Sequence, residues 1–228
     1  MAGIVSVGVL ESLVDVVVPP LVAAAAARYP GVQLRVVTAY SGHLQQWLDD
    51  GEVDLSLLYN LAGTPSLAVV PLVREDLWAV APTAAGLAPD RPVTWARLLE
   101  QPMVLPVAGH GLRVLIDQAR ASTPVEPRIA VEANSMHVQK KLVVAGHGWT
   151  VLPAAGVADD VAAGVLSGAP LTEPELSRSV VLGLPRGMRT PPPVEAVAAT
   201  LGRLVRALVH SGAWPSARLS VPAGEDGG

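Results

Sequence analysis

The sequence contains no cysteine, which excludes disulfide bonds, thiol catalysis and thiolate metal sites together and fits a cytoplasmic protein. Lysine is scarce as well: 2 lysines stand beside 14 arginines, no basic run is longer than two residues, and the net charge is −4. A nucleic-acid-binding surface needs a basic patch or stripe. These 228 residues alone are therefore expected to bind DNA poorly.

No apolar run is long enough to cross a bilayer. The longest, VDVVVPPLVAAAAARY (residues 14–29), is interrupted by Asp15 and by Pro19-Pro20. It begins well inside the chain, with no basic segment before it and no clear cleavage site after it, unlike a signal peptide. We therefore expect a soluble, cytoplasmic protein whose 50% hydrophobic content fills one large domain or two lobes of roughly 100 residues.

Motifs for covalent and phosphate chemistry are missing too. The sequence has no G-x-S-x-G elbow, no G-x-x-x-x-G-K-[ST] loop and no G-x-G-x-x-G after a strand. Its five histidines lack the spacing of a zinc-binding helix. The one carboxylate cluster, LDDGEVD (48–54), is typical of a solvated helix end and turn. The sequence favours binding over catalysis, with neither cofactor nor metal.

Short aliphatic and β-branched runs alternate with helical patterns, which predicts α/β architecture with largely parallel sheets. The predicted strands are residues 4–9, 33–39, 53–59, 67–73, 75–82, 102–107, 128–133, 149–153 and 179–185. The predicted helices are residues 12–29, 41–50, 94–100, 111–121, 135–145, 154–163 and 192–212. Pro19-Pro20 should kink or split the first helix. Residues 215–228, rich in Pro, Gly and Ser, are predicted to form a disordered tail.

In open α/β sheets, ligands bind outside the carboxyl ends of the strands, where helix N-termini offer backbone N–H groups. Four strand-to-helix junctions can be read from the sequence: GVLES (8–12), AYSGH (39–43), VAGHG (107–111) and EANSM (132–136). Three of them carry a serine near the first helical turn, at Ser12, Ser41 and Ser135. Each serine alone could be an N-cap of its own helix. Together, the junctions favour a shared cleft for a small anion or polar metabolite.

Several side chains near these junctions leave two interpretations open. His43 and His110 either contact a ligand or are satisfied turn histidines. Arg113 either pairs with an anionic ligand through its guanidinium group or forms a surface or interlobe ion pair. Trp149 either packs in the core or lines a pocket.

The motif AGHG occurs twice, at residues 108–111 and 145–148. No longer repeat accompanies it, so it does not indicate a solenoid. Each copy predicts a glycine turn, the first entering a helix and the second joining a helix to a strand.

Over residues 3–212, six motifs in order resemble the effector-binding domain of LysR-type transcriptional regulators. They are GIVSVGVLES…PPLVAAAAARYPGVQLRV, SGHLQQWLDDGEVDLSLLYN, PLVREDLWAVAP, HGLRVLIDQA, LVVAGHGWTVLP and GVLSGAPLTEPELSRSVVLGLP. The resemblance implies a two-lobed fold of the periplasmic-binding-protein type II-like class, with two Rossmann-like subdomains and an interlobe cleft. Subdomain I would comprise residues 1–74 and 181–214, and subdomain II residues 75–180.

The resemblance also implies which residues contact the effector. They are Glu11, Ser12, Ser41, Gly42, Asn60, His110, Gly111, Asn134, Ser135, Trp149 and Thr150. It further implies a small, anionic metabolite as effector, a homodimer or homotetramer formed through subdomain I, and DNA binding only through an N-terminal winged helix-turn-helix. Because the chain begins at the effector domain, we expect it to be a piece of a longer regulator.

Two other functions stay open at this point. A transporter's solute-binding protein has a similar fold, although the missing export signal counts against it. An enzyme of two-lobed α/β type would require turnover that depends on His110 or His43.

Overall fold

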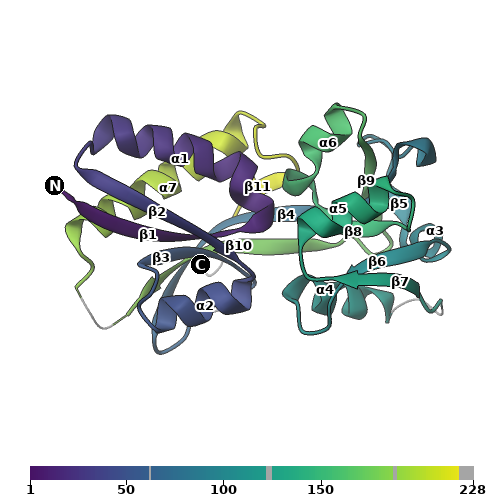
Figure 1. The fold of residues 1–228 in the computed structure, drawn as a ribbon, viewed down its shortest axis with the longest axis horizontal. Coiled ribbons are helices and arrows are strands. Elements are labelled where there is room, and N and C mark those ends of the chain that lie inside the picture. Colours follow the sequence, from purple (N-terminus) through teal and green to yellow (C-terminus); the bar gives the residue numbers. More distant parts are fainter. Residues whose placement is uncertain (62, 122–124, 187–188, 221–228) are drawn as a thin grey trace, which may run out of the picture. The chain divides into compact units, whose positions relative to one another are not determined.

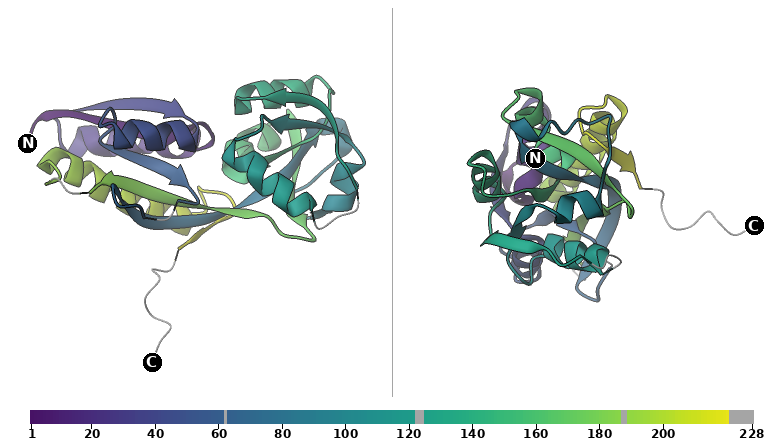
Figure 2. Two further views of the ribbon diagram at one scale, coloured as in Figure 1. Left: turned by 90° about the horizontal axis from the view of Figure 1, so that it is seen from below. Right: turned by 90° about the vertical axis from the view of Figure 1, so that its right-hand side faces the viewer.

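The computed structural model describes residues 1–61, 63–121, 125–186 and 189–220, and the chain divides into two compact units. Unit 1 comprises Met1–Glu75 and Arg178–Gly228, and unit 2 comprises Asp76–Ser177. The chain therefore crosses after Glu75 and after Ser177, near the boundaries that we expected after residues 74 and 180. Both crossings lie inside strands, namely β4 (Leu67–Pro82) and β10 (Ser177–Pro185) (Figure 1, Figure 2).

The sheet of unit 1 has the strand order β2-β1-β3-β10-β4. Strand β1 (Gly3–Leu10) is parallel to β2 (Val32–Ala39) and to β3 (Leu55–Tyr59), and β10 is antiparallel to β3. Every residue of β1 from Val5 to Leu10 is buried, as expected for a parallel strand covered by helices on both faces. The parallel arrangement predicted from the sequence is thus confirmed for β1, β2 and β3 but not for β10, so the sheet of unit 1 is mixed.

Helices α1 (Val14–Arg28) and α7 (Pro192–His210) pack side by side on one face of this sheet, and α2 (Ser41–Asp49) covers the other (Figure 1). The expected split at Pro19-Pro20 does not occur, because α1 is one helix containing both prolines. Val17 and Leu21 flank the prolines and are fully buried. Their packing outweighs the poor helix propensity of proline.

The C-terminal segment differs from the expected disordered tail. After α7, Trp214 is buried, and Ala217–Leu219 form strand β11, which is antiparallel to β4. The prediction of disorder from residue 215 is therefore wrong for residues 215–220, and residues 221–228 lie outside the described part of the chain. The segment lacks a periodic pattern because a three-residue strand is too short to show one.

Unit 2 contains the second half of β4 together with β8 (Thr150–Pro153), β9 (Leu166–Thr172) and β5 (Val93–Thr94). Strands β8 and β9 each pair with β4 in antiparallel fashion, whereas β6 (Pro102–Pro106) and β7 (Arg128–Ala133) form a separate parallel pair. The helices around them are α3 (Trp95–Leu99), α4 (Gly111–Arg120), α5 (Met136–Val144) and α6 (Ala158–Ala162), with 3₁₀ turns at Thr83–Ala85 and Ala154–Gly156.

Three sequence predictions differ from this structure. Residues 67–73 and 75–82 form one strand, β4, because the charged residues between them stay in the extended ladder. The helix predicted over residues 154–163 is a 3₁₀ turn followed by the short helix α6. Strand β9 was not predicted, since Gly168 and Pro170 interrupt its apolar pattern. Within the described residues, no helix is both long and apolar enough to cross a membrane.

Candidate functional site

The carboxyl edge of unit 1 brings together residues from two predicted junctions and from the end of β3. Leu10 pairs with Ala39 across β1 and β2, and Gly8 pairs with Ser56 across β1 and β3. The residues that follow these strands, Glu11-Ser12 and Tyr40-Ser41, therefore lie beside the end of β3 at Tyr59. The parallel register of the strands, rather than any sequence spacing, creates this polar edge.

Ser41 does not cap its own helix. It is the first residue of α2, and its Oγ accepts a hydrogen bond from the backbone N–H of Tyr59 at 2.9 Å. Among the described residues, no side chain caps the N-terminus of α2. Gly42 faces open space, since a Cβ added there would meet nothing within 4 Å. Gly42 and His43 in this first turn are exposed, and the first N–H groups of a helix have no partner within it.

Ser12 is not an N-cap either. It lies within the 3₁₀ turn Glu11–Leu13 and is 8% exposed. Its Oγ accepts a hydrogen bond from Arg178 Nη2 at 2.8 Å and lies 2.5 Å from the hydroxyl oxygen of Tyr59. The N-cap interpretation of both Ser12 and Ser41 is therefore wrong, because each hydroxyl is used in a contact between elements distant in sequence.

Beneath Ser12 lies a buried ion pair that the sequence analysis missed. The Nε of Arg178 donates to Glu75 Oε1 at 2.6 Å, and the two side chains are 3% and 0% exposed. The other oxygen, Glu75 Oε2, accepts a hydrogen bond from Trp214 Nε1 at 2.9 Å. The guanidinium carbon of Arg178 also lies 3.5 Å from the ring centroid of Tyr59. Arg178 is thus held by both a carboxylate and an aromatic face.

The Ser12–Tyr59 pair presents a hydrogen-bond donor. Burial raises the pKa of the Tyr59 phenol, an effect that Arg178 partly offsets, so the phenol keeps its proton near neutral pH. The two hydroxyl groups carry two protons, and only one of these can lie in the bond between them. Among the described residues, no other acceptor is recorded for the second proton.

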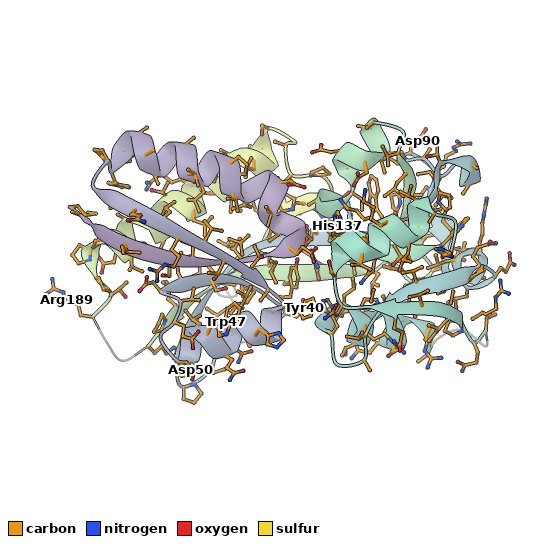
Figure 3. The ribbon with its side chains drawn as sticks, viewed as in Figure 1. Tyr40, Trp47, Asp50, Asp90, His137 and Arg189 are labelled. Carbon is orange, nitrogen blue, oxygen red and sulfur yellow. The ribbon has the colours of Figure 1, made fainter. Side chains whose placement is uncertain are left out.

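Asn60 and His43 lie at the same end of unit 1 but differ in their contacts. Asn60 has a left-handed backbone (φ 47°), and its Oδ1 accepts a hydrogen bond from the N–H of Ser179 at 2.8 Å, which ties β3 to β10. His43 is exposed on α2 and contacts the rings of Tyr40 and Trp47, both of which Figure 3 labels. Its ring centroid lies 5.9 Å from that of Tyr40 and 6.4 Å from that of Trp47.

Unit 2 has a polar carboxyl edge of its own. Pro106 at the end of β6 pairs with Ala133 at the end of β7, so the residues that follow, His110-Gly111 and Asn134-Ser135, come from neighbouring strands. His110 Nδ1 accepts a hydrogen bond from the N–H of Leu112 at 3.1 Å and caps α4. Ser135 caps α5, as its N-cap interpretation predicted. A Cβ at Gly111 would meet nothing within 4 Å.

Arg113 is engaged inside unit 2. Its guanidinium group donates to Asp117 at 3.0 Å, to the carbonyl of Pro106 at 3.1 Å and to Glu132. The hydrogen bond that Arg113 donates to Glu132 is the main cause of the raised pKa of Arg113. Two carboxylates therefore balance its charge, as the ion-pair interpretation expects.

Trp149 and Thr150 lie at the amino end of β8, whereas the other candidates of unit 2 follow the carboxyl ends of β6 and β7. Trp149 forms a parallel bridge with Met103, near the beginning of β6, and its side chain belongs to the hydrophobic core of unit 2. Thr150 is fully buried, with its Oγ1 3.5 Å from Gln139 Oε1. The structure thus places both away from the carboxyl edge, in agreement with the core-packing interpretation of Trp149.

The geometry defines a binding domain made of two Rossmann-like α/β units, each with a polar carboxyl edge. Within the described residues, no group of three His, Asp or Glu side chains could hold a metal ion. Residues 1–206 match the family model of the LysR substrate binding domain. The chain belongs to this family.

Individual relatives agree with that assignment. The chain is 30% identical over 217 residues to the HTH-type transcriptional regulator BbuR of Bordetella bronchiseptica. The aligned region covers 94% of this chain and 66% of BbuR. The effector binding domain of QuiR in complex with shikimate superposes with a TM-score of 0.79 at 17% identity, covering 91% of this chain and 99% of QuiR's. The regulatory domain of Synechocystis PCC6803 CcmR in complex with 2-PG superposes with a TM-score of 0.79 at 17% identity. This match covers 90% of this chain and 98% of the CcmR chain.

These comparisons confirm the periplasmic-binding-protein type II-like fold and the LysR resemblance seen in the sequence. They do not support the transporter alternative. The chain spans 66% of the length of BbuR, less than two thirds.

Proposed function

We propose that this chain senses a small, anionic metabolite for a LysR-type transcription regulator. The observation that carries the proposal is the Ser12–Tyr59 hydroxyl pair, which Arg178 holds in place and which retains a proton without a recorded protein acceptor among the described residues. An oxygen of the effector would accept that proton. The N–H groups at the beginning of α2, next to Gly42, would add further donors to the same oxygen-rich group.

The other proposed contacts follow from the two carboxyl edges. In unit 1 they are Glu11, Ser41 and Asn60, and in unit 2 they are His110, Gly111, Asn134 and Ser135. The relatives QuiR and CcmR, whose structures contain shikimate and 2-PG, supply the first compounds to test. Arg113 is left out as an anion contact because Asp117 and Glu132 already neutralise it.

The full-length regulator would act in the cytoplasm as a homodimer or homotetramer, and it would bind DNA through a helix-turn-helix outside this chain. An effector that binds one conformation better than another shifts the population toward it. The same free-energy difference changes the affinity of the whole regulator for DNA. This mechanism requires no catalytic residue, so we propose that the chain is not an enzyme.

Replacing Ser12 by alanine and Tyr59 by phenylalanine together is expected to weaken effector binding at least about tenfold, because the double variant has no hydroxyl proton for the effector and a hydrogen bond to a charged group contributes about 1.5–3 kcal/mol. Either change alone should weaken binding less, since it leaves one hydroxyl group that can still donate its proton. A melting screen with shikimate, 2-PG, other small carboxylates and inorganic phosphate would identify a ligand, and calorimetry would compare its affinity for the variants.

Ser66→Ala is the matched control, because Ser66 belongs to unit 1 but donates to Asp49 instead. Its affinity for the ligand should equal that of the unchanged chain. If no compound raises the melting temperature, or if the double variant Ser12→Ala/Tyr59→Phe binds as tightly as the control, the proposed effector contact is wrong.

A further inference from the structure

The segment Ser211–Ser220 follows α7 and lies beyond residues 1–206, the part of the chain that matches the family model. It is nevertheless built into unit 1. Trp214 is 2% exposed, and β11 places Ala217 opposite Glu75 in the antiparallel ladder with β4. The segment thus adds a strand and a buried indole at the position where β4 carries its buried carboxylate.

The contact between this segment and Glu75 is polar as well as apolar. The indole N–H of Trp214 donates to Glu75 Oε2, while Arg178 donates to Glu75 Oε1. One carboxylate therefore accepts hydrogen bonds from the C-terminal segment and from the arginine that holds the proposed effector site. A change in one of these bonds alters the charge density available for the other.

Arg178 connects Glu75 to the Ser12–Tyr59 hydroxyl pair. Arg178 Nη2 donates to Ser12 Oγ, and Ser12 Oγ is bonded to the hydroxyl of Tyr59. Trp214, Glu75, Arg178 and Ser12 thus form a continuous chain of hydrogen bonds, and all four residues are buried. Bonds in such a low-dielectric setting are stronger and more strongly coupled than those at the surface.

We propose that the segment Ser211–Ser220 is a regulatory part of the effector site, coupled to it through the Trp214–Glu75–Arg178–Ser12 relay. This inference rests on the proposed function and adds a regulatory element to it. An effector oxygen that takes the remaining hydroxyl proton makes Ser12 a better acceptor for Arg178. The bond of Arg178 to Glu75 weakens in turn, and that of Trp214 to Glu75 strengthens, which favours docking of β11 on β4.

Linkage makes this coupling reciprocal: docking of the segment raises effector affinity by the same factor by which the effector favours docking. Trp214, Glu75 and Arg178 are therefore positioning residues that act through Ser12. Trp214→Phe keeps an apolar ring but removes the N–H donor. It should weaken binding of an effector about fivefold or more, near the lower end of usual coupling factors.

The first test needs no effector. The chain contains 5 tryptophans and 3 tyrosines, so labelling with 5-fluorotryptophan or 3-fluorotyrosine gives simple fluorine NMR spectra. The Trp214 signal is assigned by its loss in Trp214→Phe, and the Tyr59 signal by its loss in Tyr59→Phe. Ser12→Ala should move the Trp214 signal, and Trp214→Phe should move the Tyr59 signal. A merely structural contribution would lower the melting temperature without moving these distant signals in the folded protein.

Ser56→Ala is the control, because Ser56 is also buried in unit 1 but bonds to the backbone carbonyls of Gly8 and Leu57. It should leave the Trp214 signal in place. If Ser12→Ala folds poorly, Tyr59→Phe serves as the second variant for the Trp214 signal. The relay is overturned if neither variant moves the Trp214 signal. It is also overturned if changes at Ser12 or Tyr59 move the Trp214 signal but Trp214→Phe leaves the Tyr59 signal in place.

The second test separates the relay from the proposed function. Shikimate and inorganic phosphate are titrated into the fluorotryptophan-labelled chain, with binding measured independently by calorimetry. Binding that moves the Trp214 signal supports the relay, whereas binding with a stationary signal overturns it and leaves effector sensing intact. If neither probe binds, shikimate and phosphate are not effectors of this chain. The first test, which needs no effector, then decides whether the relay exists.

Discussion

Replacing Glu75 by glutamine is expected to lower the free energy of unfolding by about 3–5 kcal/mol, the usual cost of removing one partner of a buried ion pair. The carboxylate is fully buried and accepts from both Arg178 and Trp214. A glutamine amide has one oxygen for these two donors and turns an N–H₂ group toward the other. The charge of Arg178 is then uncompensated. Urea denaturation followed by circular dichroism measures the loss.

Glu195→Gln is the matched control for this change. Glu195 is exposed in the first turn of α7, in the same unit, and its replacement should change stability by less than about 0.5 kcal/mol. The double variant Glu75→Leu/Arg178→Met should recover part of the loss, because an apolar pair of similar volume leaves no buried charge. Equal stabilities of Glu75→Gln and Glu195→Gln would contradict the assigned ion pair.

Strands β1 and β2 and helix α2 were predictable because each depends on local pattern. Residues 4–9 and 33–39 were predicted as strands and form β1 and β2, and the helix predicted over 41–50 ends one residue earlier in the structure. Their polar ends were predictable for the same reason, since parallel strands separated by helices bring their carboxyl ends to one edge.

The partners of the polar side chains could not be predicted in this way. Glu75 and Arg178 are 103 positions apart, and they meet because of the sheet order rather than any local spacing. The sequence did carry a signal, since the charged residues 74–76 interrupt the apolar strand β4, and Arg178 is the one charged residue in β10. The hydrogen-bond partners of Ser12 and Ser135 could not be predicted from the sequence either. Both stand at strand-to-helix junctions, yet Ser135 caps a helix and Ser12 bonds to Arg178, because the sheet places the buried guanidinium group of Arg178 beside Ser12.

Gly148→Ala is expected to destabilise unit 2 by about 3 kcal/mol, combining overpacking and backbone strain. Gly148 joins α5 to β8, and the next residue, Trp149, donates its N–H to the carbonyl of Pro102 at 2.7 Å. A Cβ at position 148 would lie 2.4 Å from that carbonyl oxygen and 2.9 Å from its carbon. Backbone atoms cannot rotate away as a side chain can. The strand β8 must therefore shift relative to β6, which chemical denaturation and a change in the near-UV circular dichroism of the tryptophans would detect.

The repeated AGHG motif provides the controls for this prediction. Gly146 has a left-handed backbone (φ 80°), but a Cβ there would meet nothing within 4 Å, so Gly146→Ala should cost only about 1–2 kcal/mol of backbone strain. Gly111 ends the other copy and begins α4 in open space, so Gly111→Ala should leave stability unchanged or raise it slightly. The predicted order of loss is Gly148, Gly146, Gly111. Equal losses at Gly148 and Gly146 would mean that β8 can move away from Pro102. In that case the close backbone approach does not hold the two strands together, and the second AGHG acts as a turn alone, as the first does.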